Sequence, residues 1–430
     1  MRSTKANSLS LILFQIVEII LLPFVAVYIF RSALSRSTFF ERYGCGGWRT
    51  LKTKTKGRRV IVFHAASIGE FQGLKGIISQ LRVRYPQDVF VSTYTGLLAR
   101  KVIMDSKLVD EVLPLPFDSY LTMRSAFKDL DIRAAIIAEK EIWPSLMERL
   151  SVLGAKIYLV NGKLSEKSFR SYLRFSPIFS RSISQFDAII AQSEEYRDRF
   201  ARLGAKNISV MPNAKHDFAH DTLDTTAFAK KLKLDLALPV VTFGSVRIEE
   251  EAGVVDVIAR VATQATCIVA PRYIERAATI ASLLSAKNIE CIMQSDIKMA
   301  SGASSRPRVL ILDSVGVLVN CYAISTLCFV GGTFDSSGGH NPFEPARFGV
   351  PAIIGPNFRN QAEEVKELKA HNGIFQVNSY EELAAKLLEL LSSQDQLTLV
   401  GSNAKEVVLR YSGSSKAIAD VIFENIEARR

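Results

Sequence analysis

The sequence contains few cysteines and lacks the common nucleotide-binding and hydrolase motifs. Its 430 residues include five scattered cysteines without a C-x-x-C pair, namely Cys45, Cys267, Cys291, Cys321 and Cys328. This spacing argues against a disulfide framework and fits a reducing compartment. A G-x-x-x-x-G-K-[ST] loop, a dinucleotide G-x-G-x-x-G fingerprint and a G-x-S-x-G turn are absent, which makes ordinary ATP, NAD or serine-hydrolase chemistry a poor fit.

The sequence also has fewer acidic than basic side chains, 43 against 54, which gives a net charge of +11 and a pI near 9.3. This excess indicates an anionic partner and leaves nucleic acid, an acidic membrane surface and a phosphorylated substrate as candidates. Hydrophobic residues at 48% and charged residues at 23% are typical of a globular protein. The length is typical of two domains.

One long apolar run lies near the N-terminus, from Leu9 to Phe30. It is long enough to cross a bilayer and no small-residue cleavage site follows it, so we expect a retained membrane anchor. Basic residues are concentrated from Arg31 to Arg59, which predicts that the main body is cytoplasmic. Glu18 favours the alternative of a helix lying in the interface, and either arrangement holds the protein at the membrane.

Short apolar runs alternate with helical patterns in the first half of the chain. Buried strands are predicted within residues 58–67, 88–95, 111–116, 132–141, 155–163, 186–195 and 206–215. A helix is predicted over residues 69–86, where Pro86 ends it. Such alternation is typical of a parallel sheet with helices on both faces.

The pattern restarts after a polar linker with a helix at residues 219–239. Strands are predicted within residues 240–246, 265–272, 289–294, 308–314, 325–334 and 350–356, and a helical tail within 402–426. The fold class is therefore α/β, with two Rossmann-like, doubly wound domains facing a cleft. Ligands in such folds bind at the carboxyl ends of the strands.

Small residues and a glutamate follow the first predicted strand, in HAASIGEF. Gly69 lets the backbone turn closely round a ligand, and Glu70 opens the next helix. A carboxylate there either caps its own helix or acts as a general base for an incoming hydroxyl. Glu139 and Glu141, at i and i+2 of another predicted strand, point the same way, and they either bind something or form a solvated strand end.

Candidate anion contacts follow strands of the second half. Arg272 ends a strand and suits a phosphate, while the turn in GSVRIEEE opens a helix whose free amides can hold an anion. Gly316, Gly331 and Gly332 mark close turns after strands and are further candidate contacts for the ligand of this half. The alternative is that Arg272 is an ordinary surface arginine and that the glycines only form turns.

The stretch GGHNPFEPARFG places Asn341 and Glu344 at the start of a predicted helix. A glutamate there can accept hydrogen bonds from both hydroxyls of a ribose, and the alternative is a tight turn with His340 in the core. Metal chemistry has weak support, because the D-x-D at residues 129–131 and the cluster at 216–221 are typical of solvated surface. We therefore expect no metal site.

Several of these stretches occur together, in this order, in one known family. The chain resembles the 3-deoxy-D-manno-octulosonic acid (Kdo) transferases of lipopolysaccharide synthesis over nearly its whole length, anchor included. The resemblance rests on HAASIGE, EKEIWP, NGKLSEKS, AQSEEYRDRFARLGA, NAKHD, APR, VGG and GGHNPFEPARFGVPAIIGP. Its most specific element is G-G-H-N-x-x-E-P-A.

The resemblance implies a GT-B glycosyltransferase that moves Kdo from CMP-Kdo to the lipid A precursor, lipid IVA, at the inner membrane, with inversion and without a metal or other cofactor. It places the general base at Glu70 and a phosphate-facing lysine at Lys215. The donor contacts fall on Arg272, Gly316, Asn341 and Glu344. Anionic inner-membrane lipids are implied as partners, and nucleic acid is not.

The expected domains are an anchor at residues 1–36, an acceptor domain at 37–218, a nucleotide-sugar domain at 219–402 and a helix at 403–430 that packs back on the acceptor domain. The chain departs from the family pattern at Lys163, Val246, Tyr273 and Val317. Arg247, beside the second of these, is a candidate for a donor contact. The rival functions are a UDP-sugar transferase or epimerase on the same fold, and a catalytically silent membrane tether.

Overall fold

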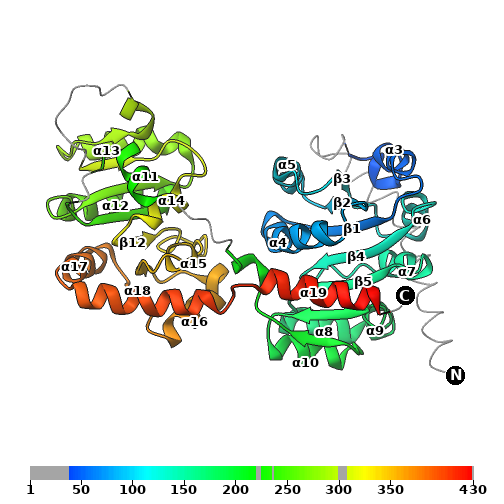
Figure 1. The fold of residues 1–430 in the computed structure, drawn as a ribbon. Helices are drawn as coiled ribbons and strands as arrows, with labels where there is room; N and C mark the ends of the chain where they lie inside the picture. The colour runs from blue at the N-terminus through cyan, green and yellow to red at the C-terminus, as the bar shows by residue number, and fades with distance from the viewer. Residues whose placement is uncertain (1–37, 219–223, 235–236, 299–307, 429–430) are drawn as a thin grey trace. The chain divides into compact units, whose positions relative to one another are not determined.

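The computed structural model describes residues 38–218, 224–234, 237–298 and 308–428. The chain divides into two compact units (Figure 1): unit 1 comprises residues 1–217 and 411–430, and unit 2 comprises residues 218–410. The expected anchor, Leu9–Phe30, lies outside the described residues. Among the residues that are described, no helix combines the length and apolar character needed to cross a bilayer.

Unit 1 contains a parallel sheet of seven strands in the order β3-β2-β1-β4-β5-β6-β7. Every strand predicted in the first half is confirmed. Strands β1 and β2 are buried along their full length, which explains their continuous apolar sequences. The strands are β1 (Val60–Ala65), β2 (Val89–Tyr94), β3 (Glu111–Pro114), β4 (Ile132–Ala138), β5 (Lys156–Gly162), β6 (Ala188–Ala191) and β7 (Ile208–Val210).

Helices cover both faces of this sheet. The helical elements of unit 1 are η1 (Glu41–Tyr43), α3 (Gly47–Lys54), α4 (Ile68–Arg84), α5 (Leu97–Ser106), α6 (Tyr120–Ala126), α7 (Pro144–Val152), α8 (Glu166–Arg174), α9 (Ser176–Ile183), α10 (Glu194–Arg202), η2 (Ala214–His216) and α19 (Ser414–Glu427). One core joins α3, α6, α7, α8, α9 and α10 to the sheet, and a second core joins α4, α5 and α19 to it.

Helix α19 belongs to unit 1 although it comes from the other end of the chain. Figure 1 shows it in red among the blue and green elements. Ile418 and Ile422 are fully buried in the same core as Leu74 and Ile78 of α4. The backbone amides of Gly413 and Ser415 donate to the Asp217 carboxylate, both at 2.8 Å, which fixes the point where α19 begins.

Unit 2 repeats the architecture with a second seven-stranded parallel sheet, in the order β10-β11-β9-β8-β12-β13-β14. The strands are β8 (Val240–Val246), β9 (Thr266–Pro271), β10 (Ile292–Met293), β11 (Val309–Ile311), β12 (Leu327–Val330), β13 (Ala352–Ile354) and β14 (Ile374–Gln376). The edge strand β14 was not predicted, because three residues are too few to show an alternating or continuous apolar pattern.

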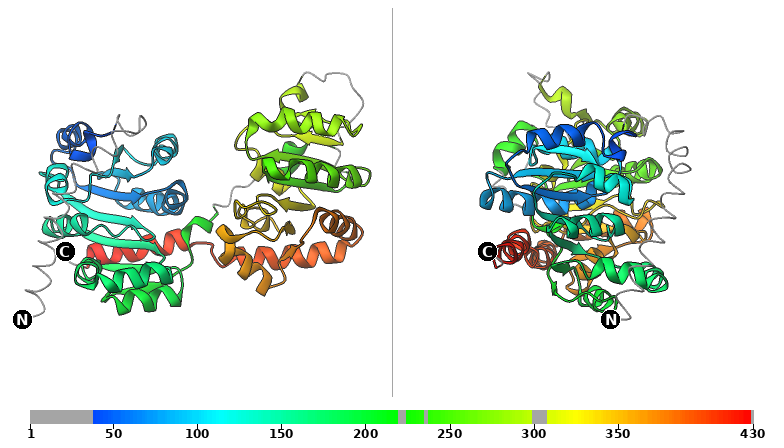
Figure 2. Two further views of the ribbon diagram at one scale, coloured as in Figure 1. Left: turned by 180° about the vertical axis from the view of Figure 1, so that it is seen from behind. Right: turned by 90° about the vertical axis from the view of Figure 1, so that its right-hand side faces the viewer.

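The helical elements of unit 2 are α11 (Thr225–Lys231), η3 (Ile248–Glu250), α12 (Glu251–Val261), η4 (Ile274–Arg276), α13 (Ala277–Ser285), η5 (Gln294–Lys298), α14 (Leu318–Ala323), α15 (Phe343–Ala346), η6 (Arg359–Gln361), α16 (Ala362–Ala370), α17 (Tyr380–Leu391) and α18 (Gln394–Leu409). Helices α12, α13 and α17 share one core with the sheet, and the other face is covered in part by α14 and by Leu232, just after α11. Figure 2 shows the orange helices α17 and α18 with this unit.

The second division of the chain lies at residue 410/411 rather than at the expected 402/403. The reason is that α18 continues to Leu409 and buries Ala404 and Val407. The helical tail predicted over residues 402–426 is therefore two helices, which belong to different units. The five cysteines are free thiols, as their spacing predicted.

Candidate functional site

Glu70 lies in the first turn of α4, immediately after β1. Ser67 caps this helix, with its hydroxyl accepting from the Glu70 amide at 3.3 Å. The Ala66 amide donates to Oε2 of Glu70 at 2.6 Å, while Oε1 makes no hydrogen bond within the described residues. The side chain is 8% exposed. Ser67 therefore caps the helix, while the Glu70 carboxylate binds the turn before it through Oε2 and keeps Oε1 available.

The electrostatic environment of Glu70 suits a base at neutral pH. Burial, followed by the charge of Glu141, raises its pKa from 4.5 to about 7. Glu139 adds to this rise, while the Ala66 and Ser67 amides oppose it. A general base works best when its pKa lies near the working pH, so the raised pKa fits the predicted role.

Glu139 and Glu141 lie near Glu70, but the interpretation as neighbours on one strand is wrong. Strand β4 ends at Ala138, and Glu139 has a left-handed φ of 51°, so the alternation of an extended chain does not apply. Glu141 accepts a hydrogen bond from the Trp143 indole at 3.1 Å and lies 3.7 Å from Nε2 of the buried His64.

The protein shifts the pKa values of Glu70 and Glu141 in opposite directions. Burial alone would raise the pKa of Glu141, but the His64 imidazole and the Trp143 indole outweigh it and hold that pKa below its usual value. Glu141 is thus a fixed negative charge, and that charge is one reason why Glu70 binds its proton more tightly.

Lys215 is placed beside α4 by a buried asparagine that sequence reasoning missed. Asn161, at φ 52° near the end of β5, donates to the Gly73 carbonyl at 3.3 Å and accepts from the Ala214 amide at 2.9 Å. It thereby joins β5, α4 and η2, which carries Lys215. An asparagine before a glycine at a strand end is the signal that could have shown it.

Gly69 is exposed and has space around it. A Cβ added there would meet only the Ser67 hydroxyl, at 4.0 Å. Packing within the protein therefore does not require a glycine at this position. The predicted close approach of a ligand is consistent with this open space and stays a prediction.

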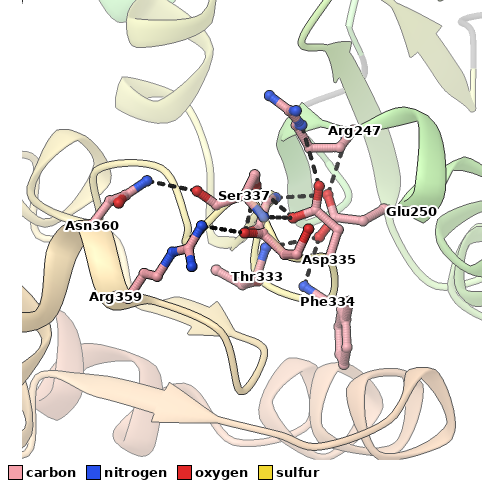
Figure 3. A network of polar contacts seen from close by, with 10 residues as sticks. Arg247, Glu250, Thr333, Phe334, Asp335, Ser337, Arg359 and Asn360 are labelled. Carbon is pink, nitrogen blue, oxygen red and sulfur yellow. Dashed lines mark hydrogen bonds and ion pairs between the residues drawn. The ribbon is translucent and has the colours of Figure 1, made fainter.

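In unit 2, Gly331 and Gly332 are part of a loop built around Glu250. This carboxylate is fully buried and accepts four backbone amides, which are those of Arg247 (3.0 Å), Gly332 (2.7 Å), Thr333 (2.9 Å) and Phe334 (3.0 Å). Figure 3 shows these contacts. The amides of Gly332 and Arg247 are therefore already used by the protein.

The same network explains why positions 331 and 332 are glycines. A Cβ on Gly331 would lie 2.8 Å from Oε2 of Glu250, and Gly332 has a φ of 72°. The expectation that the GSVRIEEE turn offers free amides to an anion is thus corrected for Arg247, because the turn's own Glu250 carboxylate occupies its amide. The sequence has three consecutive glutamates at residues 249–251, and no local feature distinguishes Glu250 from the other two.

Arg247 has an internal partner. Its Nε lies 3.3 Å from Oδ2 of Asp335, and the guanidinium lies over the Tyr273 ring at 5.6 Å. Ser337 donates to Asp335 from its amide at 3.0 Å and from its hydroxyl at 2.5 Å. Burial opposes ionisation of Asp335, but Ser337 and Arg247 outweigh it and lower its pKa. A donor contact from Arg247 stays a hypothesis.

Arg272, His340 and Glu344 share an electrostatic environment in unit 2. Arg272 is exposed after β9 and makes no hydrogen bond or ion pair through its side chain within the described residues. Burial, assisted by the charges of Arg272 and Arg247, lowers the pKa of His340 to about 4. His340 is therefore neutral at physiological pH, and its buried Nε2 has no partner among the described residues.

Glu344 retains some solvent exposure on the short helix α15, yet its carboxyl is closely surrounded. Burial raises its pKa to about 7, against the opposing charges of Arg347 and Arg272. Asn341 precedes this helix, and its Oδ1 accepts from the Phe343 amide at 3.0 Å. That oxygen organises the turn, so a ligand contact from Asn341 would have to use its amide nitrogen.

Gly316 lies on an exposed turn before α14 with a φ of 88°, and a Cβ there would meet nothing within 4 Å. Its backbone conformation, rather than crowding, explains the glycine. Within residues 38–218, 224–234, 237–298 and 308–428, no group of three or more histidines, cysteines, aspartates or glutamates is arranged to hold a metal ion.

Comparisons with known proteins agree with the resemblance. The model of the family "3-Deoxy-D-manno-octulosonic-acid transferase (kdotransferase)" matches residues 37–218. The chain is 30% identical to a 3-deoxy-D-manno-octulosonic acid transferase of Chlamydia trachomatis serovar A, over 80% of each sequence. It is 26% identical to that of Haemophilus influenzae, over 96% of this chain and 97% of the other.

Solved structures share the fold. MurG of Acinetobacter baumannii matches with a TM-score of 0.55 at 11% identity, over 85% of this chain and 99% of the other. A glycosyltransferase of Rickettsia africae matches with a TM-score of 0.54 at 12% identity, over 86% and 99%. The two parallel-sheet units thus form a GT-B fold. Together with the sequence relatives, this shows that the chain belongs to the Kdo transferase family of glycosyltransferases.

Proposed function

We propose that the protein transfers Kdo from CMP-Kdo to the lipid A precursor, lipid IVA, with inversion and at the cytoplasmic face of the inner membrane. The observation that carries the proposal is the state of Glu70, whose pKa is raised to about 7 and whose Oε1 is free within the described residues. Family membership supports the sugar and the reaction class.

Glu70 acts as the general base in this proposal. Its carboxylate takes the proton from the acceptor hydroxyl as that oxygen attacks the anomeric carbon of Kdo. The fixed charge of Glu141 opposes any other anion at this turn and strengthens Glu70 as a proton acceptor. Lys215, Gly69 and Glu139 remain proposed contacts on the acceptor or phosphate side.

Unit 2 supplies the donor contacts in this proposal. The bond that breaks joins Kdo to the CMP phosphate, so negative charge develops on the leaving phosphate oxygen and a cation there lowers the barrier. Arg272 is suited to this role because it is exposed and carries no internal ion pair within the described residues. Glu344 is proposed to accept from the ribose hydroxyls, with Asn341 and Gly316 lining the nucleotide site.

Mass spectrometry of the lipid product tests the proposal. Membranes containing the protein are incubated with CMP-Kdo and lipid IVA, and the matched control carries Glu70→Gln. We expect Kdo to be added by the wild type and not by the control. If no Kdo mass is added to the lipid, or if the protein instead epimerises a UDP-sugar in the absence of lipid, the Kdo transfer proposal is wrong.

A further inference from the structure

A pocket of about 590 Å³ lies along α6 and α7 of unit 1. This volume is within the range of small-molecule sites. It is lined by three cations, Arg124, Lys128 and Arg149, and by two carboxylates, Asp129 and Glu148. None of these residues has a part in the transfer reaction proposed above.

The three cations have no acidic partners in the part of the chain that the structure describes. Arg124 donates to the Tyr120 hydroxyl at 3.1 Å, and Arg149 donates to the Phe127 carbonyl at 3.3 Å. The Nε of Arg149 is buried and has no hydrogen-bond partner there. Lys128 is exposed and forms no ion pair with a described residue. Each cation thus retains donors for an external anion.

Helix α3 adds two further cations to this cluster. Lys52 donates to the Ser125 carbonyl at 2.7 Å, and Arg49 donates to the Cys45 sulfur at 3.9 Å. Burial lowers the pKa of Lys52, and the charges of Lys128, Arg49 and Arg149 lower it further, against Asp129. The positive groups therefore repel one another, while Asp129 attracts them without forming an ion pair within the described residues.

The two lining carboxylates form no ion pair with the three lining cations within the described residues. Glu148 is bound on both oxygens by Arg181, at 3.0 and 3.1 Å, and it accepts from Gln185 at 2.8 Å. Asp129 is exposed at a left-handed φ of 60° and forms no hydrogen bond or ion pair within the described ranges. The pocket therefore has an excess of positive charge.

We propose that this pocket binds a phosphate group, and that its source is the headgroup of an anionic phospholipid. Arg124, Lys128 and Arg149 contact the phosphate oxygens, since guanidinium groups suit them geometrically. Apolar surface beside the cations favours a lipid over free phosphate: Tyr120 is 43% exposed, Leu121 55% and Val152 68%. Lipid glycerol and acyl groups cover such surface, whereas inorganic phosphate does not.

Calorimetric titration tests the proposal without using the transfer reaction. The full-length protein, in a neutral detergent, is titrated with dihexanoyl-phosphatidylglycerol, dihexanoyl-phosphatidylcholine or inorganic phosphate. We expect the phosphatidylglycerol to bind, the phosphatidylcholine to bind much more weakly, and added salt to weaken the binding. The double variant Arg124→Gln/Lys128→Gln should bind phosphatidylglycerol roughly 20-fold more weakly, since each cation near a lipid surface contributes several-fold.

A variant that is expected to strengthen binding sharpens the test. Asp129→Asn removes the unpaired negative charge, keeps a residue that tolerates the left-handed backbone, and should tighten phosphatidylglycerol binding by roughly 3-fold. The matched control is Lys230→Gln/Lys231→Gln, which makes the same charge change on exposed positions of α11 in unit 2.

The outcomes separate the possibilities. Equal weakening in the control and in the Arg124/Lys128 variant would show that only net charge matters, and the site would be refuted. Inorganic phosphate binding as tightly as phosphatidylglycerol, with the same sensitivity to Arg124 and Lys128, would refute the lipid as the source. Loss in the Arg124/Lys128 variant together with a gain in Asp129→Asn would establish the site.

Discussion

The two units place a glutamate at almost the same local position and use it differently. Glu70 and Glu250 each follow the first strand of a sheet, and each accepts a backbone amide three or four residues earlier, from Ala66 or Arg247. Glu250 accepts three more amides from the loop after β12. For Glu70, the Ser67 amide is the further backbone group that favours its charge, and Glu139 and Glu141 lie near it.

This difference shows what makes a buried carboxylate structural or reactive. Four amide donors stabilise the charge of Glu250 and leave it no capacity to take part in chemistry. Burial and two neighbouring carboxylates outweigh the Ala66 and Ser67 amides at Glu70 and raise its pKa to about 7. The predictions below test that contrast, starting with the largest expected effect.

Glu70→Gln should reduce Kdo transfer by about 10²–10⁴-fold, the usual contribution of a general base. Glutamine can still accept from the Ala66 amide, so folding and CMP binding should be retained. The measurement is the transfer rate with saturating CMP-Kdo, together with CMP affinity as the control. A rate close to that of the wild type would refute the assignment of the base.

Glu250→Ala should lower the free energy of unfolding of unit 2 by about 3 kcal/mol, because it leaves buried amides without an acceptor. Glu70→Ala, the matched change in unit 1, should cost less than about 1 kcal/mol, since only one amide loses its acceptor. Denaturant unfolding gives the comparison, and hydrogen exchange at Gly332, Thr333 and Phe334 localises it. Equal losses of unfolding free energy in the two variants would contradict the proposed difference between Glu250 and Glu70.

Arg272→Ala should weaken CMP binding by about 10-fold, the scale of one charge-assisted hydrogen bond that is partly screened by solvent. Thermal stability should not change, because this exposed side chain has no internal ion pair among the described residues. Lys230→Ala, another exposed cation of unit 2, serves as the control and should bind CMP normally. Unchanged affinity in Arg272→Ala would remove this residue from the donor site.

The pH dependence of both rate and stability should follow Glu70. The rate should rise with pH through about 7, as the base loses its proton, and Glu141→Gln should move this rise to lower pH because a like charge is removed. The raised pKa means that the folded state binds this proton more tightly than the unfolded state. The resulting stability is present below pH 4.5 and is lost as pH rises through 7.

Glu70→Gln lacks this titration, so its stability relative to the wild type should increase from pH 4.5 to 7. Denaturant unfolding at several pH values measures the difference. A constant difference across this range would show that the pKa of Glu70 is not raised in the folded protein.

The smallest effect is expected from metal removal. A chelator such as EDTA should leave the transfer rate unchanged, because the proposed reaction stabilises the leaving phosphate with Arg272 rather than with a divalent ion. The assay is the same product measurement with and without the chelator. Loss of transfer that is restored by added Mg²⁺ would contradict the metal-independent proposal.

Local signals predicted much of the fold and of the turn that carries Glu70. The helix predicted over residues 69–86 is observed at Ile68–Arg84, and it could be identified because its pattern depends on adjacent residues. Strand β14 escaped prediction because it is short, and the arrangement of Glu139 was mispredicted because its left-handed φ is set by the turn that ends β4.

By itself, the sequence determined the series of strands, the two α/β units and the family, since these depend on local apolar periodicity and on motif order. The tertiary structure alone decided that Glu250 holds the Gly332–Phe334 loop and that Glu141 raises the pKa of Glu70. It also brought together cations from α3, α6 and α7. Each of these results depends on burial or on contacts between residues far apart in the chain, and no local pattern encodes either.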